Sequence, residues 1–179
     1  MRLFTITILA LIFFACQNSK KEKTIATNFQ FELETKLSGA PEQVYDKLTG
    51  DISPWWDHTF SGNPHQLYIE AKPGGGFYEI FDESGDGVRH AVVTGAQRGK
   101  LLRMEGPLGL AGHALTLVST YHLSAINDST ILKIEVHGAG EFEAEWPEVI
   151  ENVWKHFMIE QFKPYWEKSL KTNKSNPGK

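Results

Sequence analysis

Residues 146–168, WPEVIENVWKHFMIEQFKPYWEK, decide the fold of this 179-residue chain. Their apolar side chains recur every three or four residues, the spacing of an α-helix. These side chains are Trp146, Val149, Ile150, Val153, Trp154, Phe157 and Met158. Pro147 fits the first turn of such a helix, whereas Pro164 should kink it or end its last turns. The apolar arc is too broad for a helix lying on a surface, so we expect the helix to pack deeply against a sheet.

Alternating stretches supply that sheet. In residues 29–37, apolar or threonine side chains alternate with polar ones, which predicts a half-buried strand. A short helix is expected after Pro41, and a second short helical piece should end at Trp55 and Trp56. Further strands are expected, between glycine-rich turns, at 67–71, 77–81, 88–95, 101–105, 115–123 and 130–137. The order predicts an α+β fold in which a curved antiparallel sheet wraps around one long C-terminal helix.

Several short stretches match one known superfamily in the same order. They are Ala40-Pro41-Glu42-Gln43-Val44-Tyr45, Trp55-Trp56, His58-Thr59, residues 69–79, Asp86-Gly87 and residues 100–104. With these stretches the chain resembles the START-like (SRPBCC, helix-grip) superfamily, especially the branch of activators of a heat-shock chaperone ATPase and their bacterial relatives. The resemblance implies a helix-grip fold. It does not fix the function, because the superfamily includes lipid carriers, hormone receptors, cyclases and chaperone regulators.

The N-terminus has the pattern of an export signal. Arg2 precedes an apolar run that ends in Phe13-Phe14-Ala15-Cys16, and this run is shorter than the roughly 20 apolar residues that span a bilayer. The tetrad resembles the lipobox of bacterial lipoproteins, in which the cysteine is lipidated after cleavage. The alternative is an ordinary secretory signal that happens to contain a cysteine. The resemblance implies a lipid-anchored protein of the bacterial cell envelope, expected at the outer membrane and facing the periplasm.

Composition sets the remaining boundaries. We expect a signal peptide at 1–15, a flexible tether at 16–28, the START-like domain at 29–168 and a disordered tail at 169–179. Cys16 is the only cysteine, so the chain cannot form an internal disulfide. The net charge of -4 gives no electrostatic basis for binding nucleic acid.

A surplus of aromatic and inward-facing polar side chains is expected where the helix meets the sheet. We predict that they line an internal apolar cavity: Trp55, Trp56, Phe60, Tyr78, Ser119, Tyr121, Trp154 and Phe157. The competing interpretation is that these rings fill a solid core. The apolar loop 106–112 is either a mobile flap at the cavity mouth or a buried connection between two strands. Such a cavity would bind a small hydrophobic or amphipathic ligand, including a lipid.

Glu160 is the candidate that would turn a binding protein into an enzyme. If the helix keeps 3.6 residues per turn, Glu160 falls on the apolar arc beside Val153 and Phe157, where a desolvated carboxylate could serve as a general acid or base. The protein would then be a cyclase- or hydrolase-like enzyme. The alternative is a structural Glu160 at the edge of the arc, paired with a neighbouring side chain. A third possibility is a protein-interaction module related to chaperone activators, which the export signal opposes because that ATP-driven partner lies in another compartment.

The histidines do not predict a metal site. The chain has seven, but none of them is paired with another at the i, i+4 spacing that places two ligands on one helical face, and there is no second cysteine. His122 and His137 are expected to face solvent, and the family resemblance suggests a position for His58 at the rim of the cavity. We therefore expect neither a metal nor another cofactor.

Overall fold

The alternating residues 29–37 lie within β1 (Ile25–Ser38), which pairs along its whole length with β8 (Ser129–Phe142). The structure, a computed structural model, describes residues 25–175. Eight antiparallel strands form one sheet in the order β1-β8-β7-β6-β5-β4-β3-β2. The other strands are β2 (Gly50–Asp51), β3 (Gln66–Ile69), β4 (Gly76–Ile80), β5 (Gly87–Gln97), β6 (Leu101–Gly106) and β7 (Leu115–Ile126).

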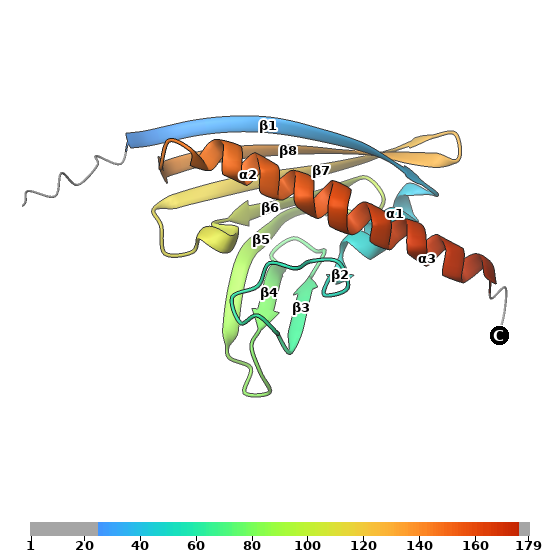
Figure 1. Cartoon of the computed structure of the whole chain (residues 1–179), viewed down its shortest axis with the longest axis horizontal. Helices are drawn as coiled ribbons and strands as arrows, with labels where there is room; N and C mark the ends of the chain where they lie inside the picture. The colour runs from blue at the N-terminus through green and yellow to red at the C-terminus, as the bar shows by residue number, and fades with distance from the viewer. Residues whose placement is uncertain (1–24, 176–179) are drawn as a thin grey trace, which may run out of the picture.

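A long helical rod lies across the concave face of this sheet (Figure 1). It consists of α2 (Trp146–Lys155), a π-helical segment η2 (His156–Phe162) and α3 (Lys163–Ser175). A short α1 (Pro41–Leu48) follows β1, and a 3-10 turn η1 (Leu108–Leu110) joins β6 to β7. The architecture is therefore the predicted α+β fold, a curved antiparallel sheet that grips one long helix.

The core lies between the rod and the sheet. Phe157, Met158 and Phe162 of the rod share one hydrophobic core with buried residues of the sheet, among them Leu132 and Val136 of β8. Each large apolar side chain buried in this way stabilises the fold by about 1.5–3 kcal/mol. The helix is consequently held by its own apolar face, as its broad arc requires.

The rod departs from its predicted course in the middle. A π-helix has one more residue per turn than an α-helix, so the buried face passes from Met158 to Phe162 and then to Trp166. Pro164 follows directly after this widened segment and does not end the rod. The prediction of a disordered tail at 169–179 is wrong for residues 169–175, because α3 continues through them to Ser175.

The structure also differs from the sequence prediction at the tether and at the segment before Trp55 and Trp56. The tether predicted at 16–28 is shorter, because Ile25 already pairs with Phe142 in the sheet. The second short helix predicted before Trp55 and Trp56 is a single turn instead, in which the backbone N–H groups of both tryptophans donate to the Ile52 carbonyl. This turn begins directly after β2 and contains Pro54, and the chain does not continue from it into a helix.

The signal peptide predicted at 1–15, the lipidated Cys16 and residues 17–24 of the tether lie outside the described residues. Within residues 25–175, no helix is long and apolar enough to cross a membrane.

Trp166, in the first turn of α3, connects the rod to the end of β1, because its indole N–H donates to the Ser38 carbonyl at 2.8 Å and its ring is buried. Trp166→Ala should lower the free energy of unfolding by about 3–5 kcal/mol, the usual cost of emptying a large buried site. Urea denaturation followed by circular dichroism measures this. Lys168→Ala, at an exposed position on the same helix, should change stability by less than about 0.5 kcal/mol. Equal effects of the two substitutions would contradict a fastening role.

Candidate functional site

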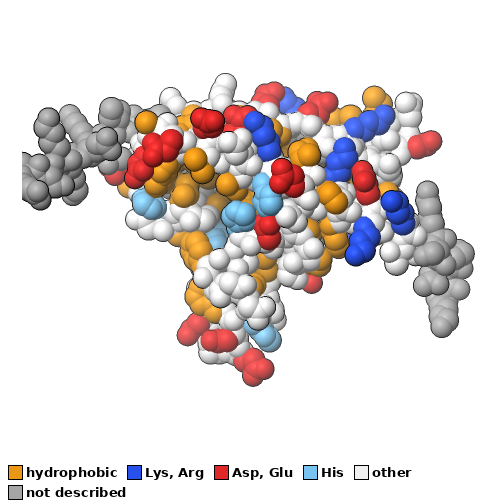
Figure 2. Space-filling model, viewed as in Figure 1, with side chains coloured by type: hydrophobic (Ala, Val, Ile, Leu, Met, Phe, Trp, Pro, Cys, Tyr) orange, Lys and Arg blue, Asp and Glu red, His pale blue; other side chains and the backbone are white. Residues whose placement is uncertain are grey.

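A cavity of about 490 Å³ lies between the rod and the sheet. Its walls are mainly apolar and come from β4, β7, η1 and the first half of the rod. These walls include Phe77, Leu108, Leu117, Ile150, Trp154 and Phe157. Figure 2 shows hydrophobic and histidine side chains side by side next to the long helix on this face. The seam between rod and sheet therefore contains a mainly apolar pocket that is partly open to solvent.

The loop between β2 and β3 closes one side of the cavity. The Trp56 ring stacks on Phe157 with 3.8 Å between ring centroids and an interplanar angle of 20°, which ties the loop to the rod. Beyond Trp56, residues 57–61, here called the mouth loop, continue around the opening, and Asp57, His58 and Phe60 contribute to the cavity lining. The mouth of the cavity is therefore polar, whereas its walls are apolar.

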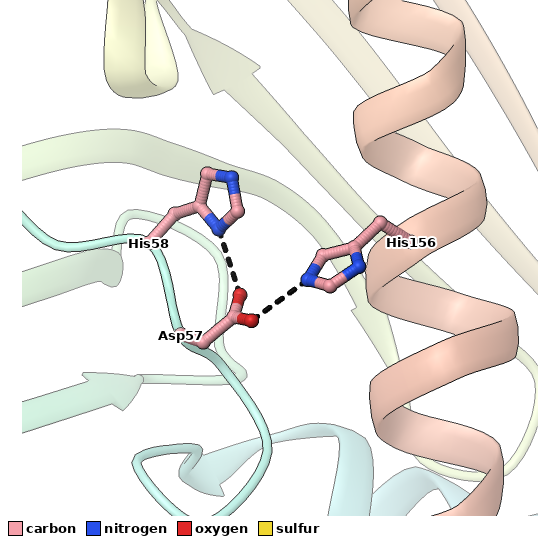
Figure 3. Close-up of side chains that lie close together, drawn as sticks. All are labelled: Asp57, His58 and His156. Carbon is pink, nitrogen blue, oxygen red and sulfur yellow. Dashed lines mark hydrogen bonds and ion pairs between the residues drawn. The ribbon is translucent and has the colours of Figure 1, made fainter.

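Asp57, His58 and His156 meet at this mouth (Figure 3). One carboxylate oxygen of Asp57 is 2.7 Å from His58 Nδ1, and the other is 2.7 Å from His156 Nε2. The second ring nitrogen of His156 is 2.9 Å from Glu160 Oε2. The cluster therefore joins the mouth loop to the π-helical segment of the rod.

Hydrogen bonds set the charge state of this cluster. Burial alone would raise the pKa of Asp57, but the hydrogen bonds from His156 and His58 outweigh it and hold this pKa below its ordinary value. Hydrogen bonds to Glu160 and then to Asp57 raise the pKa of His156. A carboxylate on either side of the His156 ring thus favours its protonated form.

A second polar pair is buried beneath the mouth loop. Glu79 of β4 has no exposed surface, and it accepts hydrogen bonds from the backbone N–H groups of Phe60 and Ser61 and from the Ser61 hydroxyl. His90 Nε2 lies 2.9 Å from the same carboxylate. Burial alone would raise the pKa of Glu79, but these hydrogen bonds outweigh it and lower this pKa. Glu79 therefore carries its negative charge at neutral pH and fixes the mouth loop.

A β-bulge aims His90 at Glu79. Tyr78 pairs with Arg89 and Phe77 pairs with Ala91, so His90 is an extra residue in β5 without a partner across the ladder. Both His90 and its neighbour Ala91 are buried, which simple alternation does not allow. The bulge thereby places an imidazole in the cavity lining.

Four of the eight predicted cavity residues line the cavity: Trp56, Phe60, Trp154 and Phe157. The other four lie elsewhere. Trp55 packs under the rod against Phe162, and its indole N–H donates to the Lys47 carbonyl. Tyr78 faces away from Phe77 and Glu79 and packs on Tyr68 of β3.

Ser119 and Tyr121 are buried in β7, deeper than the cavity wall. Burial raises the pKa of the Tyr121 hydroxyl, and the nearby Trp154 indole opposes this effect. Within the described residues, the Ser119 hydroxyl and the Trp154 indole nitrogen have no partner that meets hydrogen-bond geometry. Ser119 and Tyr121 therefore belong to the interior, whereas the Trp154 ring is part of the lining.

Glu160 does not lie on the apolar arc, because its side chain is 69% exposed and bonds to His156. The expectation failed because it continued a regular 3.6-residue helix through a segment that is π-helical. The structural alternative, an edge position paired with a neighbour, is the one observed. His58 lies at the rim as expected, and His137 is exposed on β8.

The apolar loop 106–112 forms part of the cavity wall. Leu108 has a positive φ of 51° and is buried, and Leu108, Gly109 and Leu110 all contribute to the lining. The Leu108 carbonyl also lies 3.4 Å from His90 Nδ1. The loop therefore packs onto the site through Leu108, while Gly109, Ala111 and Gly112 are exposed, so it is only partly the buried connection of one interpretation.

Glu79 offers a direct test of how the mouth loop is held. Glu79→Gln should lower the free energy of unfolding at pH 7 by about 2–4 kcal/mol, because an amide cannot accept from all the donors that surround the carboxylate. Since the folded pKa of Glu79 is lowered, its contribution is complete above the unfolded value of about 4.3 and disappears as the pH falls through the folded pKa. The stability difference between parent and variant should therefore shrink below about pH 4.

Thermal and urea unfolding between pH 3 and pH 7 measure this difference. Glu105→Gln, at an exposed position of β6, is the matched control and should have little effect at any pH. A stability difference for Glu79→Gln that stays constant over the whole pH range would show that the charge of Glu79 is not what holds the loop.

No protein-family model and no curated protein sequence matches this chain. Solved structures do match its fold. Protein SA2116 of Staphylococcus aureus, described as of unknown function, is 14% identical with a TM-score of 0.63, and the match covers 82% of this chain and 98% of that one. Protein CV1439 of Chromobacterium violaceum is 19% identical with a TM-score of 0.55, covering 77% of this chain and 96% of that one.

The Aha1 dimer of Colwellia psychrerythraea is similar in the same way. It is 16% identical with a TM-score of 0.54, and the match covers 78% of this chain and 96% of that one. Identities this low establish a shared fold and leave function open. The chain therefore has the helix-grip fold that its motifs implied.

Proposed function

We propose that this protein binds a small hydrophobic or amphipathic molecule, such as a lipid, in the cavity between the rod and the sheet. The observation that carries the proposal is the cavity itself. Its volume of about 490 Å³ falls within the roughly 300–1,000 Å³ typical of ligand pockets. Leu117, Ile150 and Phe157 give it walls that favour apolar atoms.

The distribution of polarity supports an amphipathic ligand. Apolar side chains surround the interior, whereas Asp57 and His58 stand at the mouth with side chains that are 43% and 55% exposed. A ligand with an apolar body and a polar head could bury the body and leave the head at the mouth loop. Each methylene moved from water into the cavity would contribute about 0.8 kcal/mol to binding.

A binding protein is favoured over an enzyme that uses the same cavity. The carboxylate singled out for acid–base chemistry, Glu160, is exposed and engaged by His156, so it is not positioned to touch a ligand in the cavity. A general acid or base must lie within hydrogen-bond reach of the proton that it transfers. Glu160 therefore enters the proposal as a support for His156.

We also propose that the domain is held at the bacterial cell envelope by a lipid on Cys16. The support is the lipobox-like tetrad that ends at Cys16 and the basic start of the chain. A single acyl chain binds membranes only reversibly, whereas several chains on one residue give a stable anchor. A tethered binding domain would take up apolar molecules at a membrane surface, with the outer membrane as the expected site.

Filling the cavity tests the binding function. The mature protein should bind the apolar dye anilinonaphthalene sulfonate saturably, and oleate should displace the dye. In Val153→Trp, a half-buried position of the cavity lining, the larger ring should occupy the space and weaken dye binding by roughly tenfold or more. Fluorescence titration measures the affinity, and circular dichroism confirms that the variant is folded.

Ile159→Trp is the matched control, since Ile159 lies on the same rod, is 42% exposed and is not part of the lining. It should bind dye as the parent does. No saturable binding by the folded parent, or equal binding by both tryptophan variants, would contradict a ligand cavity.

Cys16→Ser tests the anchor separately. The parent, expressed in a bacterial host with its signal, should fractionate with membranes, because multiple acyl chains bind nearly irreversibly. The serine variant should appear in the soluble fraction after cell disruption. Immunoblotting of the two fractions reads out the result, and a variant that remains with the membranes as fully as the parent would exclude lipidation at Cys16.

A further inference from the structure

We propose that Asp57, His58 and His156 form a binding site for a divalent first-row transition-metal ion, such as Zn²⁺, at the mouth of the cavity. The three residues come from two segments: the mouth loop supplies Asp57 and His58, and the π-helical segment η2 supplies His156, 99 positions from Asp57. Figure 3 shows their side chains pointing toward one another.

The distances suit a shared ion. Each residue offers one ligand atom, and the three atoms lie within 4.8 Å of one another. Metal–nitrogen and metal–oxygen bonds are about 2.0–2.2 Å long, so ligand atoms around one ion stand roughly 3–3.5 Å apart. One Asp57 oxygen is already 2.7 Å from His58 Nδ1, and the other is 2.7 Å from His156 Nε2. Small rotations of these partly exposed side chains would bring the three atoms around one ion, and the ion would displace the proton on His156 Nε2.

The chemical types of the ligands suit the same class of ion. Two imidazoles and one carboxylate are the set that holds zinc in many enzymes and non-haem iron in others. Such a set supplies three protein ligands and leaves at least one coordination position open. Because Asp57 and His58 also line the cavity, an open position would face whatever occupies the mouth.

An independent feature of the structure supports the assignment. A metal-binding histidine almost always donates its second ring N–H to a carboxylate or carbonyl, which fixes the tautomer and the ring orientation. His156 has this arrangement, because its Nδ1 lies 2.9 Å from Glu160 Oε2 while Nε2 faces the other two residues. The Gln161 amide also donates to Asp57 at 3.0 Å and orients its carboxylate. Glu160 and Gln161 are thus positioning residues for the site.

Cobalt binding provides the test, because Co²⁺ in a nitrogen–oxygen site absorbs visible light. The mature, tag-free protein titrated with Co²⁺ should bind one ion per chain, and Zn²⁺ should displace it. His156→Ala and Asp57→Asn should weaken binding by more than roughly a hundredfold, since each removes or weakens a direct ligand. Glu160→Gln should keep the stoichiometry and weaken binding by roughly tenfold to a hundredfold.

His137→Ala is the matched control, because this exposed histidine lies on β8 away from the mouth, and it should bind Co²⁺ as the parent does. Circular dichroism verifies the fold of each variant. Should His156→Ala unfold, His58→Ala decides the question in the same way, since the His58 side chain is more than half exposed. Absence of saturable Co²⁺ binding, or binding that these substitutions leave unchanged, would overturn the proposal. Dye binding in the cavity is measured without metal, so the two proposals fail independently.

Discussion

Glu79 is an ionised side chain with no exposed surface, and removing a carboxylate from water costs several kcal/mol unless other donors replace the water. Phe60, Ser61 and His90 supply those donors. To do so, the mouth loop must fold back over β4, and β5 must bulge to turn His90 inward. The position of Asp57 and His58, a few residues earlier in the same loop, follows from that demand. The polar mouth of the cavity thus rests on one buried charge.

The strands and the long helix can be predicted from the sequence because an element buried on one face has apolar residues at a regular spacing along the chain. Residues 29–37 alternate and form β1, and the apolar spacing in 146–158 gives the first half of the rod. For the second half of the rod, the prediction of which residues face the sheet is wrong at Glu160. Trp154, Met158, Phe162 and Trp166 recur every four residues, and in a regular α-helix this spacing drifts by about 40° per step. The π-helical segment absorbs the drift, so the strict spacing of four was the signal for it.

The site was harder to predict than the fold because its residues come together through irregular backbone. Simple alternation places His90 on the face opposite Ala91, and only the extra residue in β5 turns both of them inward. Asp57 and His156 are far apart in the chain, and no local period relates them. Histidines four apart on one helix indicate a metal site within a single element, whereas this cluster is shared between a loop and the rod. The aromatic residues at the helix seam were easier to identify, since Trp154 and Phe157 occupy the apolar arc itself.

If Cys16 carries the proposed lipid, the early start of β1 limits the distance between that lipid and the folded domain. Ile25 is already fixed to Phe142, so at most nine chain steps separate the anchor from the folded domain, and even a fully extended chain spans only about 30 Å over that length. Phe142, the partner of Ile25, lies just before α2, and Ile150 of α2 lines the cavity. The first residues of β1 and the first turns of α2 therefore lie at the same end of the molecule (Figure 1). A domain anchored through Cys16, as proposed above, would therefore stay close to the membrane surface. Its cavity would exchange ligand with that bilayer or with visiting partners, and would not ferry ligand across a wide aqueous gap.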